Sequence, residues 1–442
     1  MFRDTSASTS STPSPTPGTS AGPATPDLPA TPDLPATPDL PATADSSVKP
    51  DPSATLDPPE TSDLPVRALR LLRIAGLVSN FDRFCIAPML VLIAARLGTD
   101  LSTVALAAGA YYLTYGLTQP VWGLASDRLG RIRVLRLSLA AGSLAAAVSA
   151  LAPNPALLIA ARALCGACFA ACIPACLSHI GDVVPAARRQ RPLTDLMTAF
   201  SLGTALGTVT AGALAHYVSW RLVFALPALL AGYLWHALRH LPEPARQPAG
   251  ASLLAPFRVV LGSRWMWYVM GVALLEGAVL LGFLTYLAPA LESRGVPAPV
   301  AGAVSALYGV GAMACAQLVK KLVGRWSPVL LIVAGGVQAA VAYGLAAVSR
   351  GVPALAVTAL LLGTGWSFLH TTVQSWATAV TPAARATGVA MFGVSLYGGS
   401  ALAGVLTASA AGHHAYGHLF LVAAVLTLPL TLAAAIGRAR YR

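Results

Sequence analysis

Long apolar segments follow one another along most of the chain, separated by short polar stretches. From Leu71 onward each segment holds about 20 mainly apolar residues, enough to cross a hydrocarbon layer of roughly 30 Å as an α-helix. We predict twelve spans, at residues 71–95, 104–124, 134–152, 155–182, 193–217, 220–240, 265–291, 299–319, 327–348, 353–380, 387–411 and 416–437. The pattern predicts an all-α membrane protein.

The first 66 residues follow a different pattern. They contain 15 Pro, nine acidic residues and two basic residues, and the hexapeptide Ala24-Thr-Pro-Asp-Leu-Pro29 recurs from Ala30 and from Ala36. Such a sequence has few side chains to bury, so we predict a disordered cytoplasmic tail. It lacks the basic start and apolar run of a signal peptide. The alternative is an arm that binds a cytoplasmic partner.

Composition and charge narrow the class of protein. The chain is 56% hydrophobic and 10% charged, whereas soluble proteins are about 25% charged, so soluble enzymes are excluded. The basic residues punctuate apolar segments, which argues against nucleic-acid binding. Twenty-one of them fall on one face of the predicted membrane region and four, Arg96, Arg221, Arg294 and Arg350, on the other. This bias predicts a multi-pass plasma-membrane protein with both termini in the cytoplasm.

The two halves of the membrane region resemble each other. Val184-Pro-Ala-Ala-Arg188 closes the fourth span and Thr381-Pro-Ala-Ala-Arg385 closes the tenth, 197 residues later, and Gly166 and Gly363 share this offset. Parallel repeats of six helices are typical of two-bundle transporters with a site at the interface near the membrane centre. We therefore divide the chain into a tail (1–66), a first bundle (67–240), a cytoplasmic linker (241–264) and a second bundle (265–442).

The loop between the second and third spans carries a distinctive motif, Gly123-Leu-Ala-Ser-Asp127-Arg128-Leu-Gly130-Arg131-Ile-Arg133. Gly130 permits a tight turn, the arginines hold the loop in the cytoplasm, and Asp127 can accept charge-assisted hydrogen bonds. In position and length this loop resembles the signature loop of the major facilitator superfamily. Arg162-Ala-Leu-Cys-Gly166 resembles the second motif of that superfamily, and the resemblance covers roughly residues 67 to 440.

Within the superfamily the chain looks like the twelve-helix drug:proton antiporter and metabolite-efflux branch. The resemblance implies two six-helix bundles, a conformational latch formed by Gly123, Asp127, Arg128, Gly130 and Arg131, and proton coupling that involves Arg162. It implies that Asp127 latches the bundles in the outward-facing state. One departure is that Gly203-Thr-Ala-Leu-Gly207 is followed by Thr208 where the antiporter motif has proline.

Two acidic residues lie deep within predicted spans. Asp82 is nine residues past Arg73, and Glu276 is twelve residues past Arg264. At 1.5 Å per residue these separations place the carboxyl groups about 14 and 18 Å into the membrane. An ionised carboxylate is costly at that depth, so its protonation should follow access to water. We predict that Asp82 and Glu276 couple transport to protons.

Two arginines accompany the first of these acids. Arg162 lies about 10 Å from the opposite surface, within several ångströms of the depth of Asp82, and can stabilise a nearby carboxylate or an anionic substrate. Arg83 follows Asp82 but points about 100° away on a helix, so it should face another partner. We include both arginines in the proton-coupling set. The alternative interpretation is a fixed structural ion network of Asp82, Arg83 and Arg162.

Polar and aromatic residues within the spans are candidates for contact with substrate, although each could equally pack against a neighbouring helix. In the first half they recur every four residues on one helix face, and in the second half they are spread over several spans. The set is Tyr111, Tyr115, Gln119, Tyr286, Tyr308, Gln317, Trp366, His370 and Gln374. These residues suit a partly aromatic, hydrogen-bonding solute.

Signals for other chemistry are weak. None of the three lysines, Lys49, Lys320 and Lys321, follows a glycine-rich loop, so ATP is not the expected energy source. We predict no metal, no cofactor and no enzymatic activity. The predicted function is proton-coupled efflux of a small organic molecule, such as a drug, antibiotic or metabolite, by a monomer in the lipid bilayer. Alternatives are a proton-coupled uptake permease of the same fold and a membrane sensor or scaffold.

Overall fold

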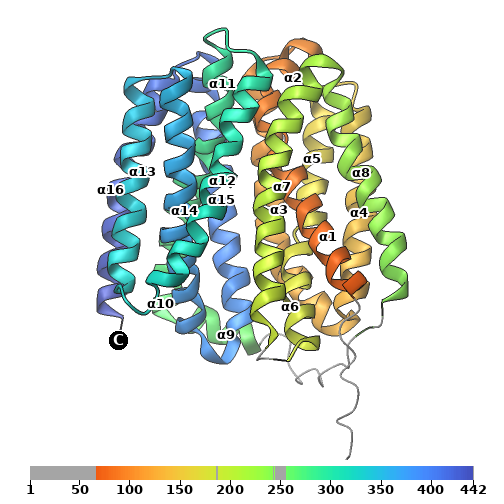
Figure 1. Cartoon of the computed structure of the whole chain (residues 1–442), viewed down its shortest axis with the longest axis vertical. Coiled ribbons are helices and arrows are strands. Elements are labelled where there is room, and N and C mark those ends of the chain that lie inside the picture. Colours follow the sequence, from red (N-terminus) through yellow and green to blue (C-terminus); the bar gives the residue numbers. More distant parts are fainter. Residues whose placement is uncertain (1–65, 186–187, 242, 244–254, 442) are drawn as a thin grey trace, which may run out of the picture. The chain divides into compact units, whose positions relative to one another are not determined.

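A computed structural model of the chain describes residues 66–185, 188–241, 243 and 255–441, which form helices and no β-strand (Figure 1). The predicted tail, apart from Val66, lies outside the described residues. The first half contains α1 (Val66–Phe84), η1 (Ala87–Met89), α2 (Leu90–Leu97), α3 (Leu101–Leu129), α4 (Arg131–Leu151), α5 (Pro155–Phe169), α6 (Cys172–Val183), α7 (Gln190–Tyr217), α8 (Trp220–Ala237) and η3 (Leu238–His240). The second half contains α9 (Ala255–Gly262), α10 (Arg264–Gly277), η4 (Ala278–Gly282), η5 (Phe283–Tyr286), α11 (Leu287–Glu292), α12 (Ala298–Leu322), α13 (Pro328–Val348), α14 (Val352–Val380), η6 (Pro382–Ala384), α15 (Arg385–Gly412) and α16 (Tyr416–Arg440).

Each of the twelve predicted spans corresponds to one helix or to helical segments that follow directly on one another. Among the described residues, ten segments are long and apolar enough to cross a membrane, and α1 with η1 and α2, bent by 40°, makes an eleventh. The remaining span is α3, which has 29 residues and is less apolar because tyrosines and threonines line it. The predicted all-helical membrane fold is confirmed.

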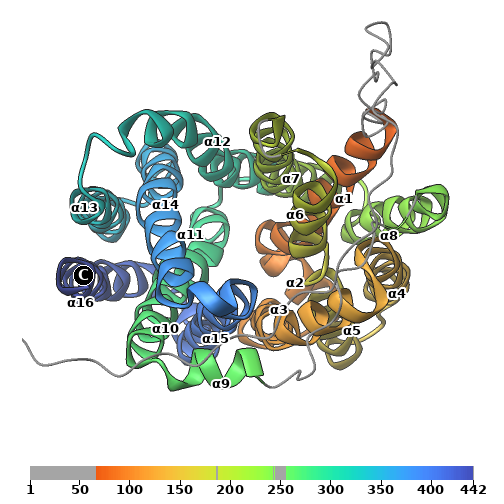
Figure 2. The ribbon, with the colours of Figure 1, turned by 90° about the horizontal axis from the view of Figure 1, so that it is seen from below.

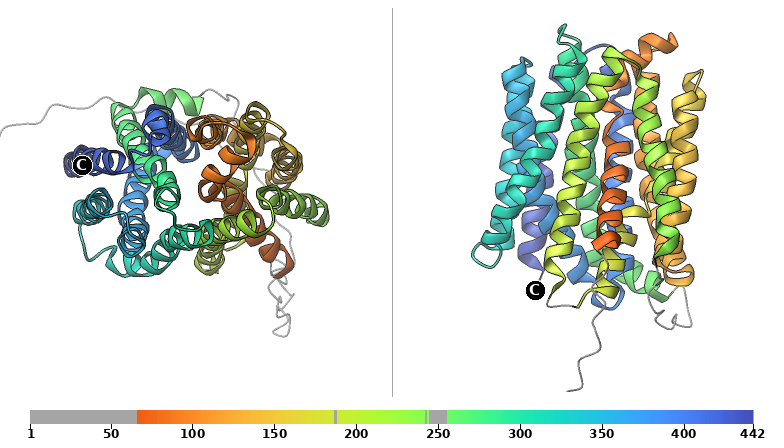
Figure 3. Two further views of the ribbon diagram at one scale, coloured as in Figure 1. Left: turned by 90° about the horizontal axis from the view of Figure 1, so that it is seen from above. Right: turned by 45° about the vertical axis from the view of Figure 1, so that its right-hand side comes forward.

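The helices of the two halves form two groups that meet along two seams. Helices α1 to α8 gather on one side of the end-on views and α10 to α16 on the other (Figures 2 and 3). The seams are the contacts of α3 with α15 and of α7 with α12. The backbones approach closely there. If Gly302 carried a Cβ atom, that atom would lie 2.5 Å from the Thr208 carbonyl oxygen, which is too close for any residue larger than glycine. Small residues permit such contacts between membrane helices.

The internal repeat predicted from the sequence is visible as a repeated helix crossing. A Cβ atom on Gly166 of α5 would lie 2.2 Å from the carbonyl oxygen of Tyr111 on α3. A Cβ atom on Gly363 of α14 would lie 2.1 Å from the carbonyl oxygen of Tyr308 on α12. Both members of the second pair stand 197 residues after those of the first. The fourth and second spans of each half therefore cross at equivalent glycines.

Substituting alanine at Gly363 is expected to destabilise the protein, because the new methyl group would meet a backbone oxygen that no rotamer change can move. Overpacking of this kind costs about 1–3 kcal/mol or more. The melting temperature of the purified protein in detergent measures the effect. The control is Gly344→Ala in α13, where a Cβ atom has no neighbour within 4 Å. Equal melting temperatures for the two variants would contradict this reading of the crossing.

Candidate functional site

Asp82 of α1 and Arg162 of α5 form a buried ion pair in the first half. The Arg162 Nη1 atom lies 2.8 Å from Oδ1, Nη2 lies 3.1 Å from Oδ2, and Nη2 also donates to the Asp82 carbonyl oxygen at 2.6 Å. Both side chains are fully buried. The rings of Tyr111 and Phe224 flank the guanidinium group at 4.7 and 4.9 Å. This forked arrangement is the strong form of an arginine–carboxylate contact.

Arg83 belongs to a different cluster. Its Nη1 atom donates to the Tyr397 hydroxyl at 2.9 Å and its Nη2 atom to the Tyr115 hydroxyl at 2.7 Å. The guanidinium carbon lies 4.3 Å from the centre of the Tyr115 ring. The expected turn of Arg83 away from Asp82 is therefore observed. Among the described residues Asp82 pairs with Arg162 and not with Arg83, so the alternative of a fixed structural ion network is reduced to the pair Asp82–Arg162.

Glu276 of α10 pairs with His370 of α14 in the second half. The distance between His370 Nδ1 and Glu276 Oε1 is 2.8 Å, and the Glu276 side chain is fully buried. Glu276 Oε2 has no hydrogen-bond partner among the described residues. The imidazole stacks on the Trp366 ring at a centroid distance of 3.8 Å. Of the predicted substrate contacts, His370 thus pairs with a predicted proton-coupling residue, and Trp366 stacks on the His370 ring.

The first span of each half is interrupted beside its buried acid. The helix α1 ends at Phe84, two residues after Asp82, before η1 and α2. The helix α10 ends at Gly277, one residue after Glu276, and continues as the π-helical segment η4. Predicted spans 71–95 and 265–291 are therefore broken helices. Interruptions of this type at membrane depth are common where transporters bind substrates and coupling ions.

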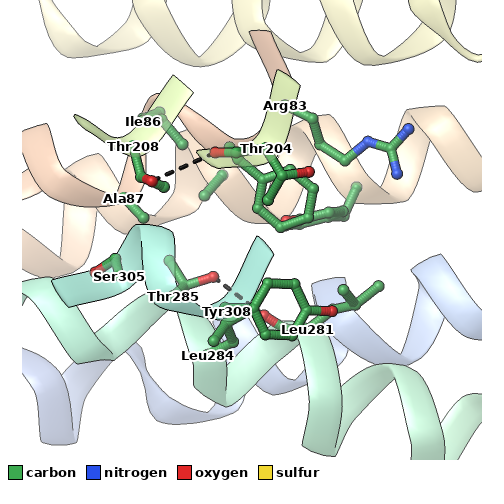
Figure 4. Close-up of a pocket in the computed structure, with 13 residues that line it drawn as sticks. Arg83, Ile86, Ala87, Thr204, Thr208, Leu281, Leu284, Thr285, Ser305 and Tyr308 are labelled. Carbon is green, nitrogen blue, oxygen red and sulfur yellow. Dashed lines mark hydrogen bonds between the residues drawn. The ribbon is translucent and has the colours of Figure 1, made fainter. Parts of the chain in front are cut away.

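A pocket lies between the halves next to these interruptions (Figure 4). Its empty space, counting the part open to solvent, is about 450 Å³. The first half contributes Arg83, Phe84, Ile86, Ala87, Ala108, Tyr112, Thr204 and Thr208, and the second half contributes Leu281, Leu284, Thr285, Ser305 and Tyr308. The lining is mainly apolar and aromatic, with one charged group.

Several predicted substrate residues lie at or near this pocket. Tyr308 lines it. Tyr115 holds Arg83, and the Tyr111 ring stacks against the Tyr115 ring at 6.0 Å, so the predicted common face of these tyrosines is observed. The third residue of that face, Gln119, is half-buried and fills the space beside Gly393 of α15.

The other predicted substrate residues lie apart from the pocket lining. The Tyr286 hydroxyl bonds to Thr407 Oγ1 at 2.8 Å within the second half. Gln374 is half-buried in α14, one turn after His370. Gln317 is exposed on α12. Packing accounts for the position of Tyr286 better than contact with substrate does.

Sequence reasoning missed several residues of the site. Tyr397 of α15 holds Arg83 across the seam, and Tyr112, Thr204, Thr208 and Ser305 line the pocket. Tyr112 adjoins a predicted residue, and Thr208 occupies the position where the antiporter motif has proline. Tyr397 had no such signal, because its role depends on how closely α15 approaches α3.

The motif loop forms a compact cluster at one end of the first half. Arg131 bonds to Asp127 at 2.5 Å and to Asp182 at 3.2 Å. Gly130 has a φ angle of +101°. The Glu243 carboxylate accepts hydrogen bonds from the backbone N–H groups of Ile132 and Arg133, both at 3.1 Å. Among the described residues, the ion pair of Asp127 therefore lies within its own half.

The remaining motif residues contribute less to this cluster. Arg128 is exposed, and Gly123 is half-buried within α3. A Cβ atom on Gly123 would have no neighbour within 4 Å. A Cβ atom on Gly130 would lie 2.4 Å from the Glu243 carboxyl carbon.

This contrast predicts that Gly130→Ala impairs transport while Gly123→Ala does not. Alanine at Gly130 must adopt backbone angles of φ +101° and ψ 159° that glycine alone tolerates, which costs about 1–3 kcal/mol, and its Cβ atom displaces the Glu243 carboxylate from the N–H groups of Ile132 and Arg133. Initial transport rates of the two variants at matched expression measure the effect. Equal rates would show that neither the turn at Gly130 nor the hydrogen bonds of Glu243 affect transport.

Comparisons with known proteins agree with this architecture. The model of the Major Facilitator Superfamily matches residues 72–405. A gallate transporter of Pseudomonas putida is 28% identical over 72% of this chain and 79% of its own length. The multidrug efflux pump LfrA of Mycolicibacterium smegmatis is 33% identical, but the match spans only 37% of this chain and 33% of the pump.

Solved structures share the fold at low sequence identity. The nucleoside transporter NupG has a TM-score of 0.68 at 14% identity, covering 86% of this chain and 100% of its own. A bacterial homologue of the human lysosomal transporter Spinster has a TM-score of 0.65 at 19% identity, covering 85% and 97%. With a family match over most of its length, this chain belongs to the Major Facilitator Superfamily of membrane transporters.

Proposed function

We propose that this chain is a proton-coupled secondary transporter that exports a small organic molecule by alternating access. The observation that supports this proposal most strongly is that two fully buried carboxylates each have a basic partner. Asp82 pairs with Arg162, and Glu276 pairs with His370. Each acid adjoins the interruption in the first span of its half. Carboxylates at membrane depth are stable only when paired or protonated, which makes them suited to carry protons.

In the proposed cycle, a proton from outside neutralises Asp82 or Glu276 and weakens its ion pair. Substrate is released outward, and the two halves rock back to the inward-facing state. Moving one charge down roughly 150 mV yields about 3.5 kcal/mol, enough for a several-hundred-fold gradient of a neutral compound. No nucleotide is needed.

Export as the direction of transport is supported by relatives named as efflux pumps. Besides LfrA, these include the efflux pump dotC of Dothistroma septosporum, which is 29% identical over 35% of this chain. The second candidate is a proton-coupled uptake permease. It is favoured by the longer match to the gallate transporter, whose name does not mention export.

Membrane vesicles of known orientation distinguish the two directions. A growth screen of an expressing host against toxic compounds first identifies a transported solute. An exporter should accumulate that solute in inside-out vesicles with an acidic lumen, relative to vesicles lacking the protein. Accumulation only in right-side-out vesicles in acidic medium would indicate uptake, and indifference to the pH gradient would refute proton coupling.

The topology proposed with this function follows from the charge distribution. In this proposal the protein is a monomer in the plasma membrane, and both of its termini lie in the cytoplasm. The two bundles comprise residues 67–240 and 265–442. A sensor or scaffold would need the predicted tail to hold its partner, whereas a transporter would not. We therefore expect deletion of residues 1–60 to leave transport intact.

A further inference from the structure

Arg83 is a buried cation without an ionic partner among the described residues. Its side chain lies inside the protein, at 6% exposure of the residue. Its two hydrogen bonds go to neutral tyrosine hydroxyls, and its Nε atom has no partner. The adjacent carboxylate, Asp82, directs both oxygens at Arg162. A buried charge is normally balanced by an opposite charge, whereas the groups found around this one are the rings of Tyr115 and Tyr397, at 4.3 and 5.4 Å.

Arg83 is the charged residue among those that line the pocket. The guanidinium group lies on the side formed by the first half, with the ring of Tyr308 on the opposite side (Figure 4). Because five N–H donors are arranged on a planar fork, guanidinium favours a planar carboxylate over a spherical anion. An anion that meets this guanidinium group from the pocket is therefore expected to be a carboxylate.

The walls beside Arg83 favour a flat aromatic body. Phe84 of α1 and Tyr308 of α12 approach each other from the two halves, with ring centroids 6.2 Å apart and an interplanar angle of 33°. Tyr112 adds a third ring, and Leu281 and Leu284 close the apolar lining. Aromatic side chains favour aromatic ligands through offset and edge contacts.

The threonine and serine hydroxyl groups in the pocket can act as acceptors toward a ligand. Thr204 and Thr208 donate their hydrogens to the carbonyl oxygens of Phe200 and Ala205. Thr285 and Ser305 donate theirs to Leu281 and Ala301. Because each hydrogen is engaged within its own helix, the oxygen lone pairs remain for ligand donors. Ring hydroxyl groups on the ligand supply such donors.

We propose that this pocket binds a hydroxylated aromatic carboxylate, with the carboxylate on Arg83 and the ring hydroxyls near the threonine and serine oxygens. The assignment rests on the proposed function, in which the pocket between the halves is the transport site, and it specifies the class of substrate. It gives Arg83 a role in binding that is separate from proton coupling by Asp82 and Glu276.

Equilibrium binding to the full-length protein in lipid nanodiscs tests the assignment, with isothermal titration calorimetry as the readout. The probes are 3,4-dihydroxybenzoate, its neutral amide 3,4-dihydroxybenzamide, and benzoate. The acid should bind at least tenfold more tightly than the amide and more tightly than benzoate. Arg83→Gln should abolish the preference for acid over amide while leaving binding of the amide largely unchanged.

Two further variants keep the test decisive. Arg83→Lys retains the charge without the fork and should retain part of the acid preference. Arg221→Gln removes an arginine that bonds to the Ala152 carbonyl oxygen, away from the pocket, and should keep all of it. Retained binding of the amide shows that a variant is folded. If Arg83→Gln also loses binding of the amide, the test is whether Arg83→Lys keeps part of the wild-type preference for the acid over the amide.

The outcomes separate this inference from the proposed function, because binding is measured without a gradient. Equal binding of acid and amide by the wild type, no binding of any probe, or full acid preference in Arg83→Gln overturns the assignment, even if transport follows the pH gradient. Acid preference that depends on Arg83 supports it, even if transport proves independent of protons.

Discussion

Replacing Asp82 by asparagine is expected to abolish transport driven by a pH gradient. The amide is nearly the same size as the carboxylate but cannot take up or release a proton at neutral pH, so the proposed coupling is lost. In proteoliposomes with an imposed gradient, the ratio of solute across the membrane should fall from as much as several-hundred-fold to near one. Exchange of labelled for unlabelled solute without a gradient should persist.

This variant needs a matched control, because asparagine leaves the buried Arg162 charge without its partner. Breaking a buried ion pair in this way costs about 3–5 kcal/mol. The double variant Asp82→Asn with Arg162→Gln removes both charges and should restore stable folding. If the pair is only a structural element, the double variant recovers gradient-driven transport; if Asp82 carries the proton, it remains uncoupled. Recovery of coupling would refute the role proposed for Asp82.

Glu276→Gln is expected to lower the steady-state accumulation of solute. The amide can still bond to His370, but it cannot exchange a proton, and the native Oε2 atom has no hydrogen-bond partner within the part of the chain that the structure describes. If Glu276 carries a second proton, the accumulation ratio should fall by up to several-hundred-fold at about 150 mV. Solute concentration on both sides of proteoliposomes at steady state measures the change.

The control for this substitution lies in the same span. Glu292→Gln makes the same chemical change at the other end of the span, in a half-buried residue of α11. It should not alter accumulation. If the two variants behave alike, Glu276 is not a coupling residue, and its contact with His370 serves only to hold α10 against α14.

The depth of charged residues could be predicted because a helix advances by a constant rise per residue. Counting from the predicted span ends placed Asp82 and Arg162 at similar depths, and the structure joins them. Glu276 and His370 were both singled out, but their pairing was not foreseen. They lie on different spans, 94 residues apart, and the contact depends on how α10 and α14 are rotated.

Orientation around the helix axis limits predictions of substrate contact in the same way. Tyr308 faces the pocket, whereas Gln317, on the same helix, is exposed. Tyr286 bonds within its own half. Hydropathy indicates which residues lie within the membrane but not which helix each one faces, so polar residues in spans are a mixture of site and packing positions.

The amino-acid sequence by itself determined the number of spans, the repeat of the two halves and the presence of charges at membrane depth. These features depend on local apolar length, charge and spacing. Only the tertiary structure decided that Asp82 pairs with Arg162 while Arg83 joins Tyr115 and Tyr397. Such partnerships depend on how closely glycine-lined helices approach and on their rotation, which are set by packing across the whole protein.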